Sequence, residues 1–476
     1  MRARLLLLAG ALVAFGASLG SGFHFDDYAI FSNPALISPE GFVDFWSLRQ
    51  TRPLTYLTFW LNYLVGGRDP LGYHLLNLAL HVGAVLLAFE CLRRLVPERT
   101  ALFAAAVFAV HPIQAESVDY VWGRSIVLAS LLTLASLYSW VKGQRWLAVA
   151  WFLAALLAKE EVAAFPLVLL LFDRQELKRN WAPIGCMLAL AFAAGARVIY
   201  ATAVTPGAPA GLQAGISPWN YWLAQGLVIL RYLRLLVIPY GFSIDPNVTV
   251  PTIWLGLGAW LLLLGLLIFA WQRGKGWAVW LIAGFLLLIP SSSLFPAADL
   301  SADRRMYLPL LVFAVAAGLL LERVKQPAIP IAIVAAFAII GFTRTMVWMS
   351  DEALWREAME RAPQKVRPRI QLARALPAAA ALEILAQARN LAPYDPAVAA
   401  ETGKTLLAEN QPEAALQEFG RALALDPKDA ANLNNRGVAL QAIGQTEAAR
   451  ADFERALTID PTLSEARQNL QKLPAR

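Results

Sequence analysis

The chain has 476 residues, of which 58% are hydrophobic and 16% charged, with 16 Trp and a formal net charge of +7. Soluble domains have roughly 45–50% apolar and roughly 25% charged residues, so this composition excludes an ordinary soluble protein. The basic residues lie in short segments between long apolar runs, which orients membrane spans and argues against a nucleic-acid partner. The sequence therefore predicts an all-α, polytopic membrane protein. Cys91 and Cys186 lie in apolar runs and predict neither a disulfide framework nor a metal site.

Residues 1–22 combine two arginines with an apolar run that ends in small residues. This pattern is typical of a cleaved signal peptide or of an uncleaved first span. Cleavage would turn the aromatic and acidic stretch that follows into a free tail, and the later basic clusters require an odd number of spans. We therefore expect an uncleaved span.

Basic clusters mark alternate loops, and placing all of them in the cytoplasm predicts eleven spans with the N-terminus inside and the C-terminus outside. The clusters are Arg2 and Arg4; Arg93, Arg94 and Arg99; Lys142 and Arg145; Arg174, Lys178 and Arg179; Arg273 and Lys275; and Arg323 and Lys325. The predicted spans are residues 4–21, 72–92, 100–116, 124–141, 146–159, 162–173, 182–203, 252–272, 277–291, 306–322 and 328–348.

Two further apolar segments are predicted to lie at the outer side of the membrane. Residues 219–241 are apolar enough to cross but contain Arg231 and Arg234. If they crossed, the next basic loop would move outside, so we expect a re-entrant or membrane-surface helix. Residues 42–64 are rich in aromatic residues and predict an amphipathic helix in the outer interface, with a break at Pro53.

The predicted topology places Asp26 and Asp27 at the outer membrane boundary, between Phe25 and Tyr28. Acids are common at the ends of spans and need no function there. Partial desolvation, however, tends to raise the pKa of one carboxyl group of such a pair and suits it to act as a general base. We expect this pair to be functional.

Other polar residues fall on the same predicted face. Ionisable residues at membrane depth are functional candidates, although an internal Lys–Glu pair can equally hold helices together. Arginines outside the membrane break the usual charge rule and are suited to hold a lipid-linked phosphate. The candidates are Arg52, His111, Glu116, Arg124, Lys159, Glu160, Glu161, Arg304, Arg305 and Tyr307.

His111 and Glu116 would share a helical face only if the helix continued through Pro112. One His and one Glu are a weak basis for a metal site. The sequence also has no Walker loop and no dinucleotide fingerprint, so no soluble nucleotide site is predicted.

From about residue 350 the composition changes to Ala, Gln, Glu and Arg, with a period of 34 residues. The aligned positions are Pro393, Pro427 and Pro461; Gly403 and Gly437; Leu382 and Leu416; and Phe419 and Phe453. The pattern predicts a tetratricopeptide-repeat solenoid with two complete copies, a degenerate copy at 378–396 and a half-repeat around 354–363. Such modules usually bind peptides or proteins, and an oligomerisation or capping element is the alternative. The predicted domains are 1–349 in the membrane and 350–476 outside it.

Several blocks of the sequence, in order, resemble the transmembrane-and-tetratricopeptide (TMTC) family of protein O-mannosyltransferases, which belong to the GT-C class. The blocks are "DDYAIFSNPAL", "RPLTYLTFWLNYLVGGRDPLGYHLLNLALH", "FAVHPIQAESVDYVWGRSIVLASL", "LAKEEVAAFPLVLLLFD" and "ADRRMYLPLL". The resemblance implies a GT-C-like bundle that transfers a sugar, usually with inversion, from a polyprenyl monophosphate.

The resemblance also implies roles for individual residues. It places the catalytic base at Asp26 and Asp27, and we favour Asp26 as the base and Asp27 as an orienting group. By position, Arg304 or Arg305 would hold the donor phosphate, with Arg52 as a weaker candidate. The implied pocket residues are His111, Glu116, Arg124, Lys159 and Glu160. Gln114 stands where the family pattern usually has a second His, which further weakens a metal site.

We therefore predict an inverting glycosyltransferase that transfers mannose or another hexose from a polyprenyl phosphate to Ser or Thr of exported proteins. One alternative keeps this donor but has a cell-envelope glycan or lipid as acceptor, and another is a non-enzymatic scaffold that presents the repeats. The expected partners are the lipid-linked donor, a protein or peptide acceptor and membrane lipids. No cofactor is predicted, and a divalent metal is not supported. The compact loops and short repeat array predict a multi-pass protein of a bacterial inner membrane.

Overall fold

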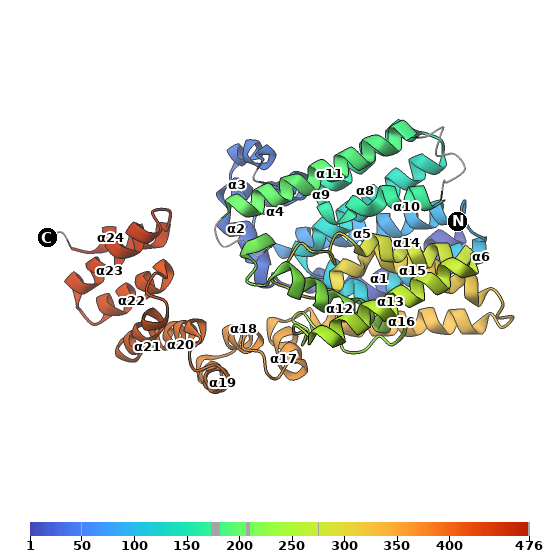
Figure 1. Ribbon diagram of the computed structural model, residues 1–476. Coiled ribbons are helices and arrows are strands. Elements are labelled where there is room, and N and C mark those ends of the chain that lie inside the picture. The colour runs from blue at the N-terminus through green and yellow to red at the C-terminus, as the bar shows by residue number, and fades with distance from the viewer. Residues whose placement is uncertain (49, 173–180, 206–209, 275, 475–476) are drawn as a thin grey trace. The chain divides into compact units, whose positions relative to one another are not determined.

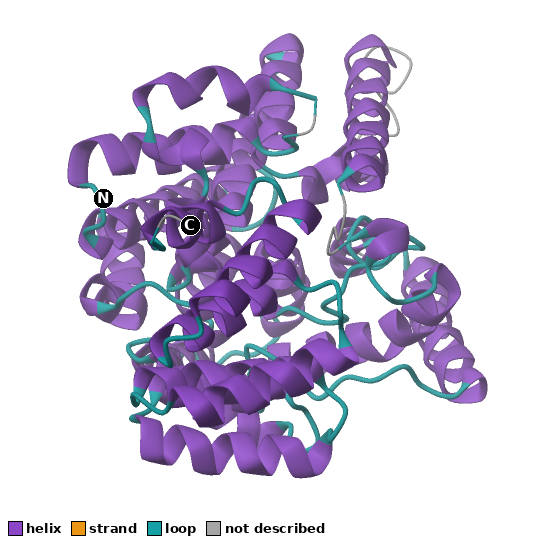
Figure 2. Ribbon diagram, turned by 90° about the vertical axis from the view of Figure 1, so that its left-hand side faces the viewer, coloured by secondary structure: helices purple, strands orange, loops and turns teal. Residues whose placement is uncertain are grey.

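The computed structural model describes residues 1–476 except 49, 173–180, 206–209, 275 and 475–476. Within the described residues the regular elements are helices, and the only bridge of β type is an isolated one between Ala210 and Ala297 (Figures 1 and 2). The predicted all-α class is confirmed. The chain divides into two compact units, Met1–Ser350 and Asp351–Arg476.

The first unit is a bundle of apolar helices, which we call the membrane unit. Its longer helices are α1 (Arg2–Phe15), α4 (Pro53–Gly66), α5 (Pro70–Leu92), α6 (Glu98–Val110), α8 (Arg124–Val141), α9 (Arg145–Ala158), α10 (Phe165–Phe172), α11 (Trp181–Val204), α12 (Pro218–Val237), α13 (Ile253–Arg273), α14 (Gly276–Leu288), α15 (Tyr307–Leu321) and α16 (Ala328–Val347). Its short elements are η1 (Gly16–Gly20), η2 (Phe25–Tyr28), α2 (Ala29–Ser32), α3 (Pro34–Ile37), η3 (Pro39–Trp46), η4 (Pro112–Gln114), α7 (Ala115–Val118), η5 (Val121–Gly123), η6 (Glu160–Ala164), η7 (Gly211–Gln213) and η8 (Asp303–Met306).

Among the described residues, seven helices are long and apolar enough to cross a membrane. There are eight if α6 and the segment Pro112–Val118, which meet at a bend of 48°, form one span. Two shorter apolar helices, α9 and α14, accompany them. This is the helix content of a multi-pass membrane protein. Each of the eleven predicted spans contains a helix, but length and composition do not fix how many cross, so the eleven-span topology stays a prediction.

The outer segments differ in part from expectation. Residues 42–64 do not form one helix with a break; η3 ends at Trp46 and α4 begins at Pro53. A proline in the first position of a helix costs no hydrogen bond, because that N–H has no helical partner, so Pro53 starts the helix. In α12, Arg231 forms an ion pair with Asp303, which explains how this apolar segment carries an arginine.

The second unit, Asp351–Arg476, is a solenoid of helices, which we call the repeat unit. Its helices are α17 (Asp351–Arg361), α18 (Arg367–Ala375), α19 (Ala378–Leu391), α20 (Pro396–Ala408), α21 (Pro412–Leu425), α22 (Ala430–Ala442), α23 (Thr446–Ile459) and α24 (Ser464–Lys472). Ion pairs join the helices of this unit, two of them between alternate helices (α18 with α20 and α19 with α21) and one between the successive helices α22 and α23. These are Arg374–Glu401 at 2.7 Å, Arg389–Glu418 at 2.6 Å and Arg436–Asp452 at 2.7 Å.

The repeat spacing has a direct packing reason. A Cβ atom on Gly403 would lie 2.8 Å from the Phe419 ring, and one on Gly437 would lie 2.5 Å from the Phe453 ring. Real Cβ contacts are not this short, so only glycine lets each phenylalanine ring pack against the preceding helix. Gly and Phe therefore recur together with the period of the repeat.

We expect Gly437→Ala to destabilise α22 and α23 by about 1–3 kcal/mol, because the new methyl group must displace the buried Phe453 ring. Hydrogen exchange of amides in these two helices, measured by mass spectrometry on the full chain, should accelerate about tenfold or more. Gly420→Ala is the matched control. A Cβ there meets no atom within 4 Å, so the substitution should raise helix stability by up to about 1 kcal/mol. Equal exchange in both variants would contradict the packing argument.

Candidate active site

Asp27 is fully buried and fixes the position of the acid pair. Its Oδ2 accepts a hydrogen bond from the His24 N–H at 2.9 Å, and its Oδ1 accepts one from the Trp122 N–H at 2.7 Å. These two donors lie in segments far apart in sequence, so the carboxylate joins η2 to η5. Burial raises the pKa of Asp27 to about 7, although the two backbone donors oppose this shift.

Asp26 is the more accessible acid of the pair. Its residue is half-buried, and its backbone N–H donates a hydrogen bond to the Tyr120 hydroxyl oxygen at 3.1 Å. Phe25, immediately before it, has φ of 41°, a backbone conformation that a bulky residue adopts only when its surroundings impose it. The chain is thus constrained on both sides of Asp26.

A second set of contacts ties this segment to the end of α16. The Ser21 hydroxyl donates to the Trp348 carbonyl at 2.6 Å, and Ser21 Oγ lies 2.9 Å from His24 Nε2. Because the hydroxyl proton is used on the carbonyl, Nε2 must carry the proton of the His24 ring and donate to Ser21 Oγ. The His24 side chain also accepts from the Asp27 N–H in a reciprocal capping box. The neutral His24 ring therefore packs under the acid pair as a fixed support.

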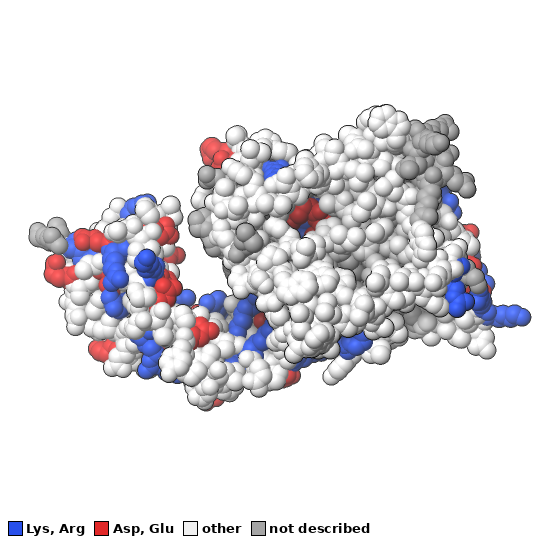
Figure 3. Space-filling view, viewed as in Figure 1, with Lys and Arg blue, Asp and Glu red and all other residues white. Residues whose placement is uncertain are grey.

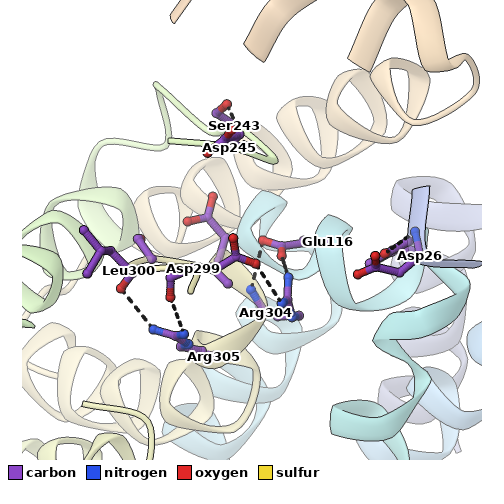
Figure 4. A network of polar contacts seen from close by, with 12 residues as sticks. Asp26, Glu116, Ser243, Asp245, Asp299, Leu300, Arg304 and Arg305 are labelled. Carbon is purple, nitrogen blue, oxygen red and sulfur yellow. Dashed lines mark hydrogen bonds and ion pairs between the residues drawn. The ribbon is translucent and has the colours of Figure 1, made fainter. Parts of the chain in front are cut away.

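Glu116 and Arg304 form an ion pair within the membrane unit. The Glu116 carboxylate is bound both by the Arg304 guanidinium and, at 3.2 Å, by the Arg304 backbone N–H. Asp299 lies 3.8 Å from the same guanidinium. In Figure 4, Asp26 lies on one side of this pair and Arg305 on the other. Arg304 is therefore neutralised by carboxylates within the protein.

Arg52 and Lys159 also have carboxylate partners. Arg52 binds Glu160 through two hydrogen bonds, of 2.8 and 3.2 Å, and Lys159 lies 3.0 Å from Glu161. Burial alone would raise the pKa of Glu160, but the charge of Arg52 lowers it to about 2. The Arg52–Glu160 pair joins the loop before α4 to η6, and the Lys159–Glu161 pair lies at the start of η6.

A polar cavity of about 310 Å³ lies beside these pairs. Its charged and hydroxyl-bearing lining includes Arg52, Glu160, Glu161, Tyr221 and Arg305. Figure 3 shows acidic side chains in a hollow on one face of the membrane unit. One wall, formed by α11, is apolar. The cavity can therefore accept a ligand that is polar at one end and apolar at the other.

Arg305 differs from the other two arginines. Its guanidinium donates to the carbonyl oxygens of Asp299, at 2.7 Å, and Leu300, at 3.1 Å, which are neutral acceptors. Within the described residues no carboxylate forms an ion pair with it. Its positive charge at the cavity is thus the one that protein groups leave unneutralised, which is the condition for binding an anion.

Three candidates lie away from this cavity. Arg124 is fully buried and donates to Asn62, Asn77 and the Tyr73 carbonyl, so it joins α4, α5 and α8. Tyr307 is buried against His81, with 2.7 Å between its hydroxyl and His81 Nδ1. The structure places both inside the bundle.

His111 is likewise buried and does not meet Glu116. Its Nε2 lies 3.3 Å from the Leu236 carbonyl, and its Nδ1 accepts from the Ile113 N–H. The helix ends before Pro112, as its sequence position suggested. Among the described residues, no group of three or more His, Cys, Asp or Glu side chains is arranged to hold a metal ion.

Several residues of the site were not singled out from the sequence. They are Ser21, His24, Tyr120, Trp122, Tyr221, Asp299 and Trp348. Ser21 and His24 are adjacent to the acid pair, and Asp299 is close to the arginine pair, so proximity to a motif could have suggested them. Trp122 contributes only its backbone N–H, which no residue type reveals.

Comparisons with known proteins bear on both units. The tetratricopeptide-repeat family model matches residues 430–463, which contain α22 and α23. The chain is 34% identical over 153 residues to the protein O-mannosyl-transferase TMTC3 of Mus musculus, 37% over 172 residues to Tmtc1 of Drosophila melanogaster, and 30% over 277 residues to Tmtc2 of the same species. The chain resembles the TMTC proteins.

The similarity covers part of each TMTC relative. The matches to these three span 29%, 32% and 50% of this chain, but only 17%, 20% and 29% of the relatives' own length. Solved tetratricopeptide-repeat structures also match part of the chain, such as the first repeat domain of Spaghetti (RPAP3), at 24% identity over 20% of this chain and 75% of that one, with a TM-score of 0.20. A TM-score this low supports no argument about function.

The raised pKa of Asp27 predicts a specific pH dependence of stability. The folded protein holds the Asp27 proton more tightly than the unfolded chain, whose carboxyl has the ordinary pKa of 3.8. The resulting stabilisation is complete below about pH 4 and is lost as the pH rises to about 7. Asp27→Asn cannot titrate, so the melting temperature of the wild type relative to this variant should fall over that range and stay constant above it. A difference that is independent of pH would contradict the assignment.

Proposed function

We propose that this protein is an inverting glycosyltransferase that transfers mannose or another hexose from a polyprenyl-phosphate donor to Ser or Thr hydroxyls of exported proteins. The similarity to proteins named protein O-mannosyl-transferases supports the activity. The observation that carries the residue assignment is the difference in hydrogen bonding and burial between Asp26 and Asp27. Both oxygens of Asp27 are occupied by backbone N–H groups, whereas Asp26 is half-buried on a constrained backbone.

In this proposal Asp26 is the general base. Its carboxylate takes the proton of the acceptor hydroxyl as that oxygen attacks the anomeric carbon of the donor. The bond from the anomeric carbon to the phosphate oxygen breaks in the same displacement, which inverts the configuration at that carbon. Asp27 and His24 hold Asp26 in position and do not touch the substrate.

The donor phosphate is assigned to Arg305. The charge that develops on the leaving phosphate needs a fixed cation, and the charges of Arg304 and Arg52 are already neutralised by Glu116 and Glu160. The polar cavity beside Arg305 supports this assignment, because it is lined with groups that can bind a sugar.

The isoprenoid chain of the donor is assigned to the space between α9 and α11. A second cavity, of about 160 Å³, lies there and shares Glu160 and Val198 with the polar cavity. Its other lining is mainly Leu and Ala, including Leu153, Leu156 and Leu190. A ligand with a phosphate head and an apolar chain fits two adjoining cavities of which one has charged lining and the other is mainly apolar.

The proposed setting is the cytoplasmic membrane of a bacterium. The basic clusters support an internal N-terminus and an external repeat unit, which would place the acid pair, the polar cavity and the repeats on the outer side. The repeat unit is proposed to bind the protein acceptor, as tetratricopeptide repeats commonly bind peptides.

We expect Asp26→Asn to lower kcat by about 10²–10⁴-fold, because the amide cannot accept the hydroxyl proton. Exported proteins from cells with the wild-type chain should carry hexose on Ser or Thr by mass spectrometry, and cells with the variant should lack it. Asp44→Asn removes an exposed acid from the same outer segment and should keep full activity. Unchanged modification with Asp26→Asn would overturn the base, and unmodified proteins in the wild type would overturn the acceptor.

Arg305→Gln should weaken binding of a polyprenyl phosphate about ten- to hundredfold, because a charge-assisted contact to the phosphate is lost. Binding can be measured by titrating the purified chain with the lipid phosphate. Arg304→Gln is the matched comparison. It leaves the buried Glu116 without its cation, so it should lower the melting temperature more than Arg305→Gln, which loses two hydrogen bonds to carbonyl oxygens but leaves no carboxylate unpaired. Equal loss of binding and of stability in both variants would contradict the distinction between them.

A further inference from the structure

Two cations converge on one tyrosine ring at the end of the membrane unit opposite the acid pair in the predicted topology. Arg94 follows α5 and Lys142 follows α8, and both lie over Tyr138, with 5.2 Å and 5.0 Å from their charged groups to the ring centroid. An Arg94 nitrogen also lies 3.4 Å from the Tyr138 hydroxyl. Figure 3 shows Lys and Arg side chains gathered at the end of this unit where the N-terminus lies in Figure 1.

Two neighbouring arginines bind a carboxylate, whereas these two cations bind none among the described residues. Arg4 and Arg93 both bind Glu90, at 2.6 Å and 2.8 Å. Neither Arg94 nor Lys142 forms an ion pair with a described residue. Positive charges are favourable at the C-terminal ends of helices, which explains why each is present. Placement at a helix end does not explain why both cations lie over the same tyrosine ring. Two like charges this close repel each other unless an anion lies between them.

A narrow apolar cavity of about 90 Å³ begins at the same two chain segments. Its lining includes Leu92, Leu95, Leu137, Val141, Phe172 and Trp280. Leu92 and Leu95 flank Arg94 in the chain, and Val141 directly precedes Lys142. The cavity continues between α5, α8, α10, α14 and α15, so an apolar chain that entered here would run into the bundle.

We propose that Arg94, Lys142 and this cavity form a binding site for an anionic glycerophospholipid of the adjoining leaflet. The lipid phosphate lies between the two cations and the Tyr138 hydroxyl, and one acyl chain enters the apolar cavity. The charge of the pair selects an anionic head group, and the cavity selects a lipid over a soluble anion. The site is separate from the polar cavity, and it does not depend on the proposed glycosyltransferase activity.

The test uses the purified full chain in nanodiscs that contain dioleoyl phosphatidylglycerol and dioleoyl phosphatidylcholine. Native mass spectrometry counts the lipids that the protein retains after release. The wild type should retain phosphatidylglycerol in preference to phosphatidylcholine. The double variant Arg94→Gln/Lys142→Gln should lose at least about tenfold of this preference, since each basic residue near an anionic lipid contributes to its binding.

Two further variants make the test specific. Arg4→Gln/Arg93→Gln removes the same number of charges from the same end of the molecule, but from residues already paired with Glu90, and should keep the preference. Leu137→Trp fills the cavity without changing charge and should also reduce retention. Melting temperatures measured for all variants identify any that fail to fold, and preference is compared only among the folded ones.

Three outcomes would overturn the proposal. The first is a wild type without preference for phosphatidylglycerol, and the second is an equal loss in the Arg4/Arg93 control. The third is a shift in melting temperature with inorganic phosphate as large as that with phosphatidylglycerol, which would show a site for a free anion. Retention lost in the Arg94/Lys142 and Leu137 variants, and kept in the control, supports the lipid site.

Discussion

The hydrogen bonds from two backbone N–H groups to the buried Asp27 carboxylate are the constraint on which the acid-pair end of the membrane unit depends. They join the segment after the first helix to the turn that begins α8, 95 residues further along the chain. Together with the Ser21–Trp348 contact and the hydrogen bond from the Asp26 N–H to Tyr120, they fix the position of η2 relative to the bundle. A buried carboxylate costs free energy, so its retention here favours a role in positioning its neighbour.

The cationic side chains of the membrane unit fall into two groups, those that form ion pairs with carboxylates and those that do not. Arg52, Arg231 and Arg304 are half-buried and bound to carboxylates, and two of these pairs, Arg52 to Glu160 and Arg304 to Glu116, link segments more than 100 residues apart. Such pairs stabilise the arrangement of loops but cannot also bind an external anion at full strength. Among the described residues, Arg305 at one end and Arg94 with Lys142 at the other form no ion pair with an acid, and these are the cations to which the proposed ligands are assigned.

The sequence predicted the parts of the molecule that depend on local or periodic patterns. The helical class and the register of the repeats, with their Gly and Phe positions, follow from residue type and spacing. The partners did not follow, because pairing between distant loops is decided by packing that a single sequence does not display. Arg124 illustrates this: a charged residue next to an apolar run suggests a pocket, but it proves to be a fully buried donor to Asn62 and Asn77. Pro53 was interpreted as a break, although the same residue at a first helical position begins a helix.

The hydrogen bond from the Ser21 hydroxyl to the Trp348 carbonyl joins the beginning of the membrane unit to its end, across 327 residues of chain. Trp348 lies two residues before the end of that unit, where the chain passes into the repeats. Any shortened form of the protein that ends before Trp348 would remove this contact and leave the Ser21 hydroxyl, to which the His24 ring donates, without its carbonyl acceptor. The two units can therefore be separated for study only by a cut after Ser350, and a cut a few residues earlier would disturb the acid pair at the other end of the sequence.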